Sequence, residues 1–122
     1  MVAPAPIEDA LKASPIISQV CMVGDGKKYL SALITLSEGK MEEIKKLNKS
    51  QMGLTLNNPE LINEVGTYVE TLNNQLANYE RIKKFTILSR EFSVADGEMT
   101  PTLKMKRSVI ESRFKDVIEG MY

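Results

Sequence analysis

The chain has 122 residues, 43% of them hydrophobic and 26% charged, which suits one domain with a real core and excludes a disordered chain. Sixteen basic residues balance sixteen acidic ones, so no net charge attracts nucleic acid or an anionic membrane. The absence of histidine excludes His-based catalytic triads and most zinc sites, and we predict no metal site. We expect neither a transmembrane segment nor a signal peptide, because no apolar run is long enough and the N-terminus lacks the charged-then-apolar pattern.

The N-terminal part of the chain predicts a loop followed by a short helix. Residues 1–6 contain two prolines and are expected to form the loop. Residues 7–13 (IEDALKA) have the spacing of an amphipathic helix. Glu8 and Asp9 would lie in its first turn, where the helix dipole favours acidic side chains.

Two strand-like runs follow, residues 16–24 (IISQVCMVG) and 29–36 (YLSALITL). The short Asp-Gly-Lys-Lys stretch between them indicates a β-hairpin. Their nearly continuous hydrophobicity predicts strands that helices cover. The single cysteine, Cys21, lies in the first run, so we expect a buried, unreactive thiol and a cytoplasmic protein.

The middle of the chain predicts two helices. Residues 38–49 are charged, with an apolar stripe of Met41, Ile44 and Leu47, and residues 51–57 read as a linker. The Asn-Pro-Glu sequence at 58–60 is typical of a helix start, and the longest helix is expected to run from there to about residue 84. Its apolar side consists of Leu61, Ile62, Val65, Val69, Leu72, Leu76 and Ile82. We interpret that side as packed on the sheet, with a partner-binding groove as the alternative.

The C-terminal part predicts a third strand at residues 85–92, a tight turn or hairpin at 94–100 and a last helix at 105–121. The buried face of that helix would consist of Val109, Ile110, Phe114, Val117 and Ile118. The predicted fold is α+β, with a small sheet of about three strands flanked by helices and a short β-hairpin before the C-terminal helix. Residues 1–122 would form one domain.

Chemistry is most plausible in residues 96–107 (DGEMTPTLKMKR), where a glycine turn, two hydroxyls, a proline and three cations precede the last helix. Cations at a helix N-terminus are disfavoured by the dipole, so Lys104 gains nothing there from helix electrostatics. Such violations of a local rule often occur at functional sites. Solvated surface lysines beside a turn are the simpler alternative. A phosphate-binding loop is another, although the glycine spacing of known phosphate-binding loops is absent.

Residues 92–107 (FSVADGEMTPTLKMKR) closely resemble the last core motif of long-chain fatty acyl-CoA synthetases, including the bubblegum-type enzymes of the adenylate-forming superfamily. The family pattern is Gly-Glu-Leu-Thr-Pro-Thr-Leu-Lys-x-Lys-Arg, from which only Met99 departs notably. Residues 2–8 (VAPAPIE) resemble the end of the family's Gly-Gly-Glu-Asn-Val-x-Pro-x-Pro-Ile-Glu segment, and residues 23–36 resemble its following hairpin. The three matches stand in the family's order, whereas residues 37–66 match poorly.

The first residue is Met where the family has Asn, and the upstream Gly-Gly-Glu is missing. We therefore expect an excised C-terminal domain that lacks the large N-terminal adenylating domain, its partner in the full-length enzyme. A free-standing α+β interaction module that has lost catalysis, with the long amphipathic helix as its contact face, is the alternative.

The resemblance implies a mobile domain of an ATP-dependent, AMP-forming long-chain fatty acid–CoA ligase, an enzyme of fatty acid and lipid metabolism. ATP, Mg²⁺ and CoA would act in the full-length enzyme, with fatty acid as the acyl substrate. No cofactor is expected in the isolated domain, which would be inactive alone. Lys104 is implied as the lysine that enters the active site for adenylation, and Thr100, Pro101 and Thr102 would shape its loop.

The domain of this family rotates between the two half-reactions. By the resemblance, Val2, Ala3 and Pro4 would then line the channel for the pantetheine arm of CoA, although a disordered chain end describes them equally well. Four cations are candidates for the CoA phosphates but are interpreted as solvated surface charge: Lys27, Lys28, Lys106 and Arg107. Glu98 is interpreted as a turn or surface residue. The parent enzyme is expected in the cytoplasm, with peripheral membrane association left open.

Overall fold

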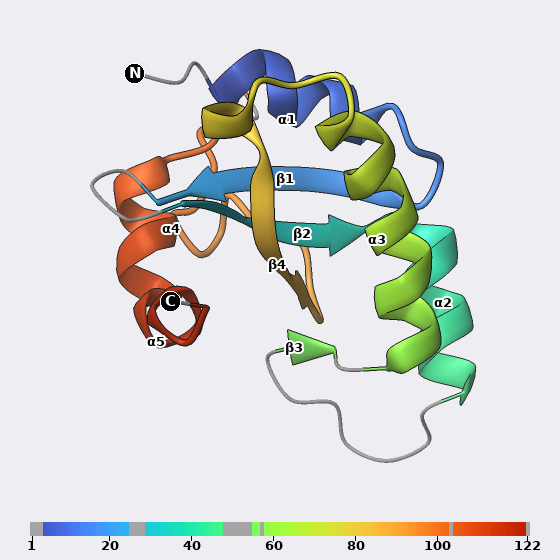
Figure 1. Ribbon diagram of the computed structural model, residues 1–122. Coiled ribbons are helices and arrows are strands. Elements are labelled where there is room, and N and C mark those ends of the chain that lie inside the picture. Colours follow the sequence, from blue (N-terminus) through green and yellow to red (C-terminus); the bar gives the residue numbers. More distant parts are fainter. Residues whose placement is uncertain (1–3, 25–28, 48–54, 57, 103, 122) are drawn as a thin grey trace.

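The structure, a computed structural model, describes residues 4–24, 29–47, 55–56, 58–102 and 104–121 (Figure 1). Its elements, in chain order, are α1 (Pro4–Lys12), β1 (Ile17–Val23), β2 (Leu30–Leu36), α2 (Glu38–Leu47), β3 (Thr55–Leu56), α3 (Pro59–Asn73), the 3₁₀ helix η1 (Asn78–Glu80), β4 (Ile82–Leu88), α4 (Arg107–Arg113) and α5 (Lys115–Glu119). The strands form one four-stranded sheet in the order β1-β2-β4-β3. The α+β prediction is confirmed, and the sheet has one short strand more than expected.

The predicted hairpin is confirmed as an antiparallel pair of β1 and β2, in which Val20 lies opposite Ile34 and Cys21 opposite Leu33. The connection at residues 25–28 lies outside the described residues. Strand β4 then pairs with β2 in parallel, and β3 pairs with β4 antiparallel. Because β2 has a neighbour on each side and helices on each face, residues 31–36 are all buried.

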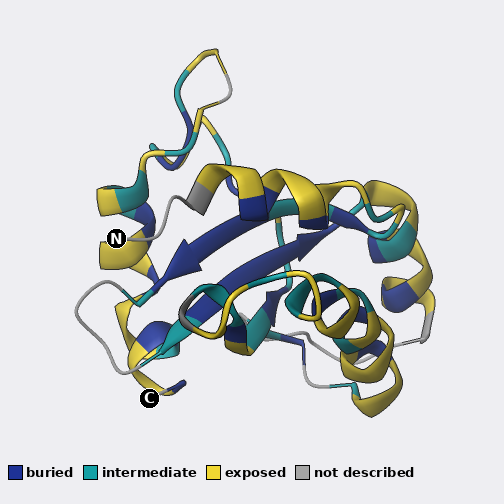
Figure 2. Cartoon of the chain, turned by 45° about the horizontal axis from the view of Figure 1, so that its top comes forward, coloured by how far each residue is buried: buried dark blue, intermediate teal, exposed yellow. Residues whose placement is uncertain are grey.

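The core has two parts, one on each face of the sheet. Side chains alternate between the faces of a strand, so neighbours such as Val20 and Cys21 belong to different parts. The larger part joins Val20 and Ile34 to apolar side chains of α1, α2 and α3. The other joins Cys21 to residues of α4, of α5 and of the junction between them, including Ile110 and Phe114. Figure 2 shows the consequence, with buried central strands between helices whose outer faces are exposed.

The longest helix is shorter than predicted. Helix α3 ends at Asn73, and the chain turns before β4 begins at Ile82, so Leu76 and Ile82 are not part of the helix. The Asn73 side chain stabilises this turn, because its amide donates to the Ile82 carbonyl (2.8 Å) and its oxygen accepts from the Ile82 N–H (2.9 Å). The apolar pattern of the sequence continues across this turn, so the pattern by itself did not predict the turn.

Other boundaries also differ from the prediction, and the third strand, expected at residues 85–92, is β4 at Ile82–Leu88. The C-terminal helix is divided into α4 and α5 at Phe114, whose backbone leaves the helical region (φ −106°, ψ 23°). The expected linker contains β3, which pairs with the end of β4 through Thr55 and Leu56. Helix α1 begins at Pro4 instead of Ile7, so its first turn holds no acidic residue.

Burial raises the pKa of the Cys21 thiol to about 12, although the Arg107 guanidinium nearby acts in the opposite direction. Since the thiolate is the reactive form, we expect alkylation of the native chain by iodoacetamide at pH 8 to be at least about 100-fold slower than alkylation of the unfolded chain. Intact-mass measurements over time, with and without guanidinium chloride, check this rate ratio. Equal rates under the two conditions would contradict a buried thiol.

Candidate functional site

The segment that resembles the family's last core motif forms a hairpin between β4 and α4. The Lys106 N–H donates to the Glu98 carbonyl (2.8 Å), Met99 and Met105 form an antiparallel bridge, and the Thr100 N–H donates to the Lys104 carbonyl (2.8 Å). The predicted hairpin thus exists, but the chain reverses after Thr100, at Pro101 and Thr102, instead of at Asp96-Gly97. The earlier turn precedes it, with Gly97 in the left-handed region (φ 76°) that favours glycine.

Lys104 lies at the far end of this hairpin, and it is exposed. Its backbone N–H donates to Thr100 Oγ1 (3.0 Å), and that hydroxyl is also 3.0 Å from Thr102 Oγ1. The Thr100 and Thr102 hydroxyls therefore stabilise the tip. Pro101 and Thr102 are exposed to solvent. Among the described residues, the Lys104 ammonium forms no ion pair. Its backbone is held in place, and its side chain can reach an anion from outside this domain.

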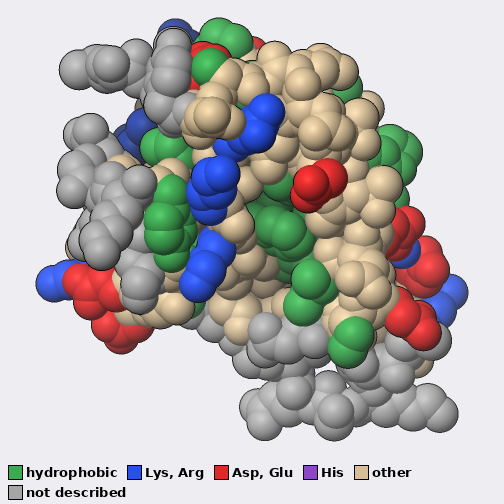
Figure 3. All heavy atoms as spheres, viewed as in Figure 1, with side chains coloured by type: hydrophobic (Ala, Val, Ile, Leu, Met, Phe, Trp, Pro, Cys, Tyr) green, Lys and Arg blue, Asp and Glu red, His purple; other side chains and the backbone are tan. Residues whose placement is uncertain are grey.

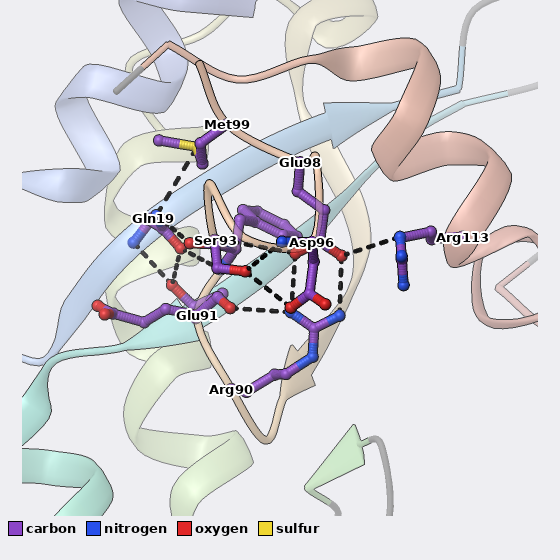
Figure 4. A network of polar contacts seen from close by, with 10 residues as sticks. Gln19, Arg90, Glu91, Ser93, Asp96, Glu98, Met99 and Arg113 are labelled. Atoms are coloured by element: carbon purple, nitrogen blue, oxygen red, sulfur yellow. Dashed lines mark hydrogen bonds and ion pairs between the residues drawn. The ribbon is translucent and has the colours of Figure 1, made fainter. Parts of the chain in front are cut away.

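The interpretation of Glu98 as a surface residue is wrong. Its side chain is fully buried, and its two oxygens accept from the two terminal nitrogens of Arg90 at 2.7 and 2.8 Å (Figure 4). One of these oxygens also accepts from the Ser93 N–H (3.1 Å), and Arg113 lies 4.0 Å from the other. The sequence has no local sign of this pairing, because Arg90 and Glu98 are eight positions apart across a turn.

Burial by itself would raise the pKa of Glu98, but the hydrogen bonds from Arg90 and the Ser93 N–H, with the charge of Arg90, outweigh it. The pKa of this carboxyl therefore lies below the ordinary glutamate value, and Glu98 is ionised at neutral pH. Because the pKa of Glu98 is lower in the folded state than in the unfolded state, the pair contributes its full stabilisation of the fold at pH values above the unfolded-state pKa. That stability is lost as the pH falls through the folded-state value.

A second polar group holds the turn before the hairpin against the sheet. The Gln19 side chain, from β1, accepts from the Phe92 N–H (2.7 Å) and donates to the Phe92 carbonyl (3.3 Å). The Thr35 hydroxyl of β2 donates to the same Gln19 oxygen (3.2 Å). The chain leaving β4 is thus attached to β1 and, through the Gln19 oxygen, to β2.

The interpretation of Arg107 as solvated surface charge is also wrong. Its guanidinium pairs with the buried carboxylate of Glu8, with 2.8 Å between Arg107 Nη1 and Glu8 Oε2. The same Glu8 oxygen accepts from the Met22 N–H (2.7 Å). The hydrogen bond with Glu8 keeps the pKa of Arg107 above its ordinary value, despite partial burial. Glu8 therefore pairs with Arg107 instead of stabilising the dipole of α1. The pair joins the C-terminal end of the hairpin to α1 and β1.

The remaining predicted residues are less informative. Pro4 is the first residue of α1, and Val2 and Ala3 lie outside the described residues, as do Lys27 and Lys28. Lys106 is exposed, as expected. Within the described ranges, no group of three or more Cys, Asp or Glu could hold a metal ion. In the same parts of the chain, no helix combines the length and the apolar character needed to cross a membrane.

The face of α3 that we considered as a contact surface is partly hollow. An open groove of about 590 Å³ lies along α3 beside β4, and its apolar lining includes Ile62, Gly66 and Phe85. Figure 3 shows hydrophobic side chains on this side of the molecule, next to a row of Lys and Arg side chains. Most of the apolar stripe of α3, including Leu61, Val65 and Val69, is nevertheless buried, which confirms that its main role is packing.

Comparison with known proteins agrees with this geometry. The sequence model of the family described as AMP-binding enzyme C-terminal domain matches residues 1–122. The long-chain-fatty-acid–CoA ligase FadD15 of Mycobacterium tuberculosis is 40% identical over 125 residues, which cover 99% of this chain and 21% of that protein. The long-chain-fatty-acid–CoA ligase ACSBG2 of Gallus gallus is 32% identical over 142 residues, which cover 99% of this chain and 19% of that protein. The chain thus spans about a fifth of the length of these relatives.

Solved structures share the fold. The adenylation domain of the carboxylate reductase GR01_22995 from Mycobacterium chelonae has a TM-score of 0.80 at 19% identity, covering 99% of this chain and 18% of that one. The A-PCP didomain of the carboxylic acid reductase from Segniliparus rugosus, in complex with AMP, has a TM-score of 0.78 at 19% identity, covering 99% and 16%.

Proposed function

Because this chain belongs to the family of AMP-binding enzyme C-terminal domains, we propose that it acts as the mobile C-terminal domain of an ATP-dependent long-chain fatty acid–CoA ligase. The observation that carries the proposal is the exposed Lys104, at the end of a hairpin held by backbone hydrogen bonds between Glu98 and Lys106 and between Thr100 and Lys104. We assign ATP, Mg²⁺, CoA and the fatty acid to the full-length enzyme, in which a large adenylating domain supplies the rest of the site.

The first half-reaction joins two anions. A fatty acid carboxylate oxygen attacks the α-phosphorus of ATP, the bond to the bridging oxygen breaks, and pyrophosphate leaves. Negative charge then develops on the non-bridging phosphate oxygens. An ammonium group on a long side chain reduces this repulsion where it arises, and a rigid hairpin limits the orientations that the lysine must sample. In this role Lys104 contacts the reacting atoms, and Thr100 and Thr102 maintain the shape of the tip.

In the second half-reaction the CoA sulfur attacks the acyl carbon and AMP leaves. We propose that the domain has then rotated and that the chain around Val2, Ala3 and Pro4 lines the pantetheine channel. Helix α1, which begins at Pro4 and packs on β1, supports this assignment because it attaches the C-terminal end of this segment to the sheet. We also propose a cytoplasmic location, which the buried free thiol of Cys21 supports.

The test is pyrophosphate exchange by the full-length enzyme, with and without this domain, over a series of fatty acids. We expect fatty-acid-dependent exchange in the intact enzyme, strongest with long chains, and a loss of about 100-fold or more when the domain is removed. Unchanged exchange without the domain would contradict the proposal. The alternative, a stand-alone interaction module, predicts a reading frame that does not continue upstream into an adenylating domain.

A further inference from the structure

We propose that Glu98 is a positioning residue for adenylation, because its buried carboxylate holds the base of the hairpin that carries Lys104. This inference rests on the function proposed above. Glu98 touches no reacting atom in this scheme and acts through the backbone. Its position is fixed twice, once by its carbonyl, which accepts from the Lys106 N–H, and once by its side chain, which Arg90 and the Ser93 N–H bind.

The first step of the argument is that Arg90 is itself held. It lies two residues after the end of β4, and its guanidinium lies 5.4 Å from the centre of the Phe114 ring. It also donates to the Glu91 carbonyl (3.0 Å) and lies 3.6 Å from the Asp96 carboxylate. Figure 4 shows Glu91, Asp96 and Glu98 around the Arg90 guanidinium. The Glu98 carboxylate is therefore attached to a cation that the turn before the hairpin and the Phe114 ring keep in place.

The second step is that the hairpin transmits the position of its base to Lys104. Hydrogen bonds link Glu98 with Lys106 and, two residues further along, Thr100 with Lys104. Two residues of a strand span about 7 Å, so the Lys104 backbone lies about that far along the hairpin from the Glu98–Lys106 hydrogen bond. A change at the base is expected to move the lysine, because these paired backbone hydrogen bonds connect the two. Misplacement of a catalytic group by about 1 Å can lower a rate about 100-fold.

The third step is that a two-point ionic anchor suits the base of a hairpin that must present its tip to another domain. A bidentate pair fixes direction as well as distance. A carboxylate that is fully buried needs these partners, since an unpaired buried charge is costly. The other strand of the hairpin is held at the same base, independently, by the Glu8–Arg107 pair. Loss of the Glu98 anchor should therefore displace the hairpin while leaving it attached to the domain.

The experiment compares the two half-reactions in the full-length enzyme. Glu98→Gln keeps the shape of the side chain but removes its charge, and Glu119→Gln, on the exposed surface of α5, is the matched control. We expect Glu98→Gln to lower the kcat of fatty-acid-dependent pyrophosphate exchange by about 10- to 100-fold, with little change in the KM for ATP. Thioester formation from preformed acyl-AMP and CoA should stay within about twofold of the control, because it uses the other pose of the domain. This half-reaction also reports that the variant is folded.

An equal loss in the two half-reactions would show a merely structural role and overturn the proposal, as would normal exchange by Glu98→Gln. Arg90→Met provides a second route to the same anchor and should reproduce the selective loss. Lys104→Ala, measured in parallel, separates the two levels of inference. Normal exchange by Lys104→Ala would overturn the proposed function and this inference together. A defect in Lys104→Ala with normal exchange in Glu98→Gln would overturn this inference alone.

Discussion

Replacing Lys104 with alanine in the full-length enzyme is expected to lower acyl-adenylate formation by about 100- to 1000-fold, because removal of one preorganised group that stabilises developing charge costs that much in well-studied sites. Thioester formation from preformed acyl-AMP should be spared, since the carboxylate and the α-phosphate no longer have to meet in that step. The measurements are pyrophosphate exchange for the first half-reaction and thioester production for the second.

Lys115→Ala is a suitable control, because Lys115 is also exposed but lies on α5, outside the hairpin. It should leave both half-reactions near their normal rates. Lys104→Arg tests the chemistry further. A planar guanidinium keeps the charge but presents it in another geometry, so we expect only partial activity. An equal fall of both half-reactions in Lys104→Ala would show that the lysine supports the fold or both poses, and the adenylation assignment would be wrong.

Phe114→Ala is expected to have the largest effect on stability. The side chain is only 2% exposed, at the point where α4 meets α5. Its ring packs edge-on against Phe92, with 5.9 Å between the ring centres, and its face lies under the Arg90 guanidinium. Truncating a buried phenylalanine removes apolar contacts and leaves a cavity, at a cost of about 3–5 kcal/mol. That is a large fraction of the free energy of unfolding of an ordinary domain.

Urea denaturation of the chain, followed by circular dichroism, measures this cost. Phe114→Leu is the matched control, because it keeps most of the apolar volume and should cost distinctly less. Val117→Ala, at a partly buried position on α5, should cost less again. A loss below about 1 kcal/mol for Phe114→Ala would mean that the second face of the sheet has no tightly packed core at this point.

Several features of the fold could be predicted from the sequence, because they depend on local patterns. Apolar runs separated by a short polar stretch predicted the β1–β2 hairpin, and Asn-Pro-Glu predicted the start of α3. The spacing of Ile110, Phe114 and Ile118 predicted the buried face of the last helical segment. The position of Lys104 at the surface agrees with the resemblance of its motif.

Other features depended on residues far apart in the sequence. The end of α3 is determined by a side chain that binds the first residue of β4, and β3 exists because β4 offers it an edge. Neither has a local signal. Hydrophobic periodicity continued through the turn after Asn73 and therefore predicted a helix that the structure ends earlier.

The candidate site shows the same division. Residue order and type were enough to place Lys104 in a family motif and to predict an exposed lysine there. Only the tertiary structure showed that Glu98 and Arg107 are anchors, because each finds its partner across the fold, Glu98 with Arg90 and Arg107 with Glu8. A charged side chain looks the same in sequence whether water or a buried counter-ion surrounds it. Which of the two applies is decided by packing, and packing is a property of the folded chain.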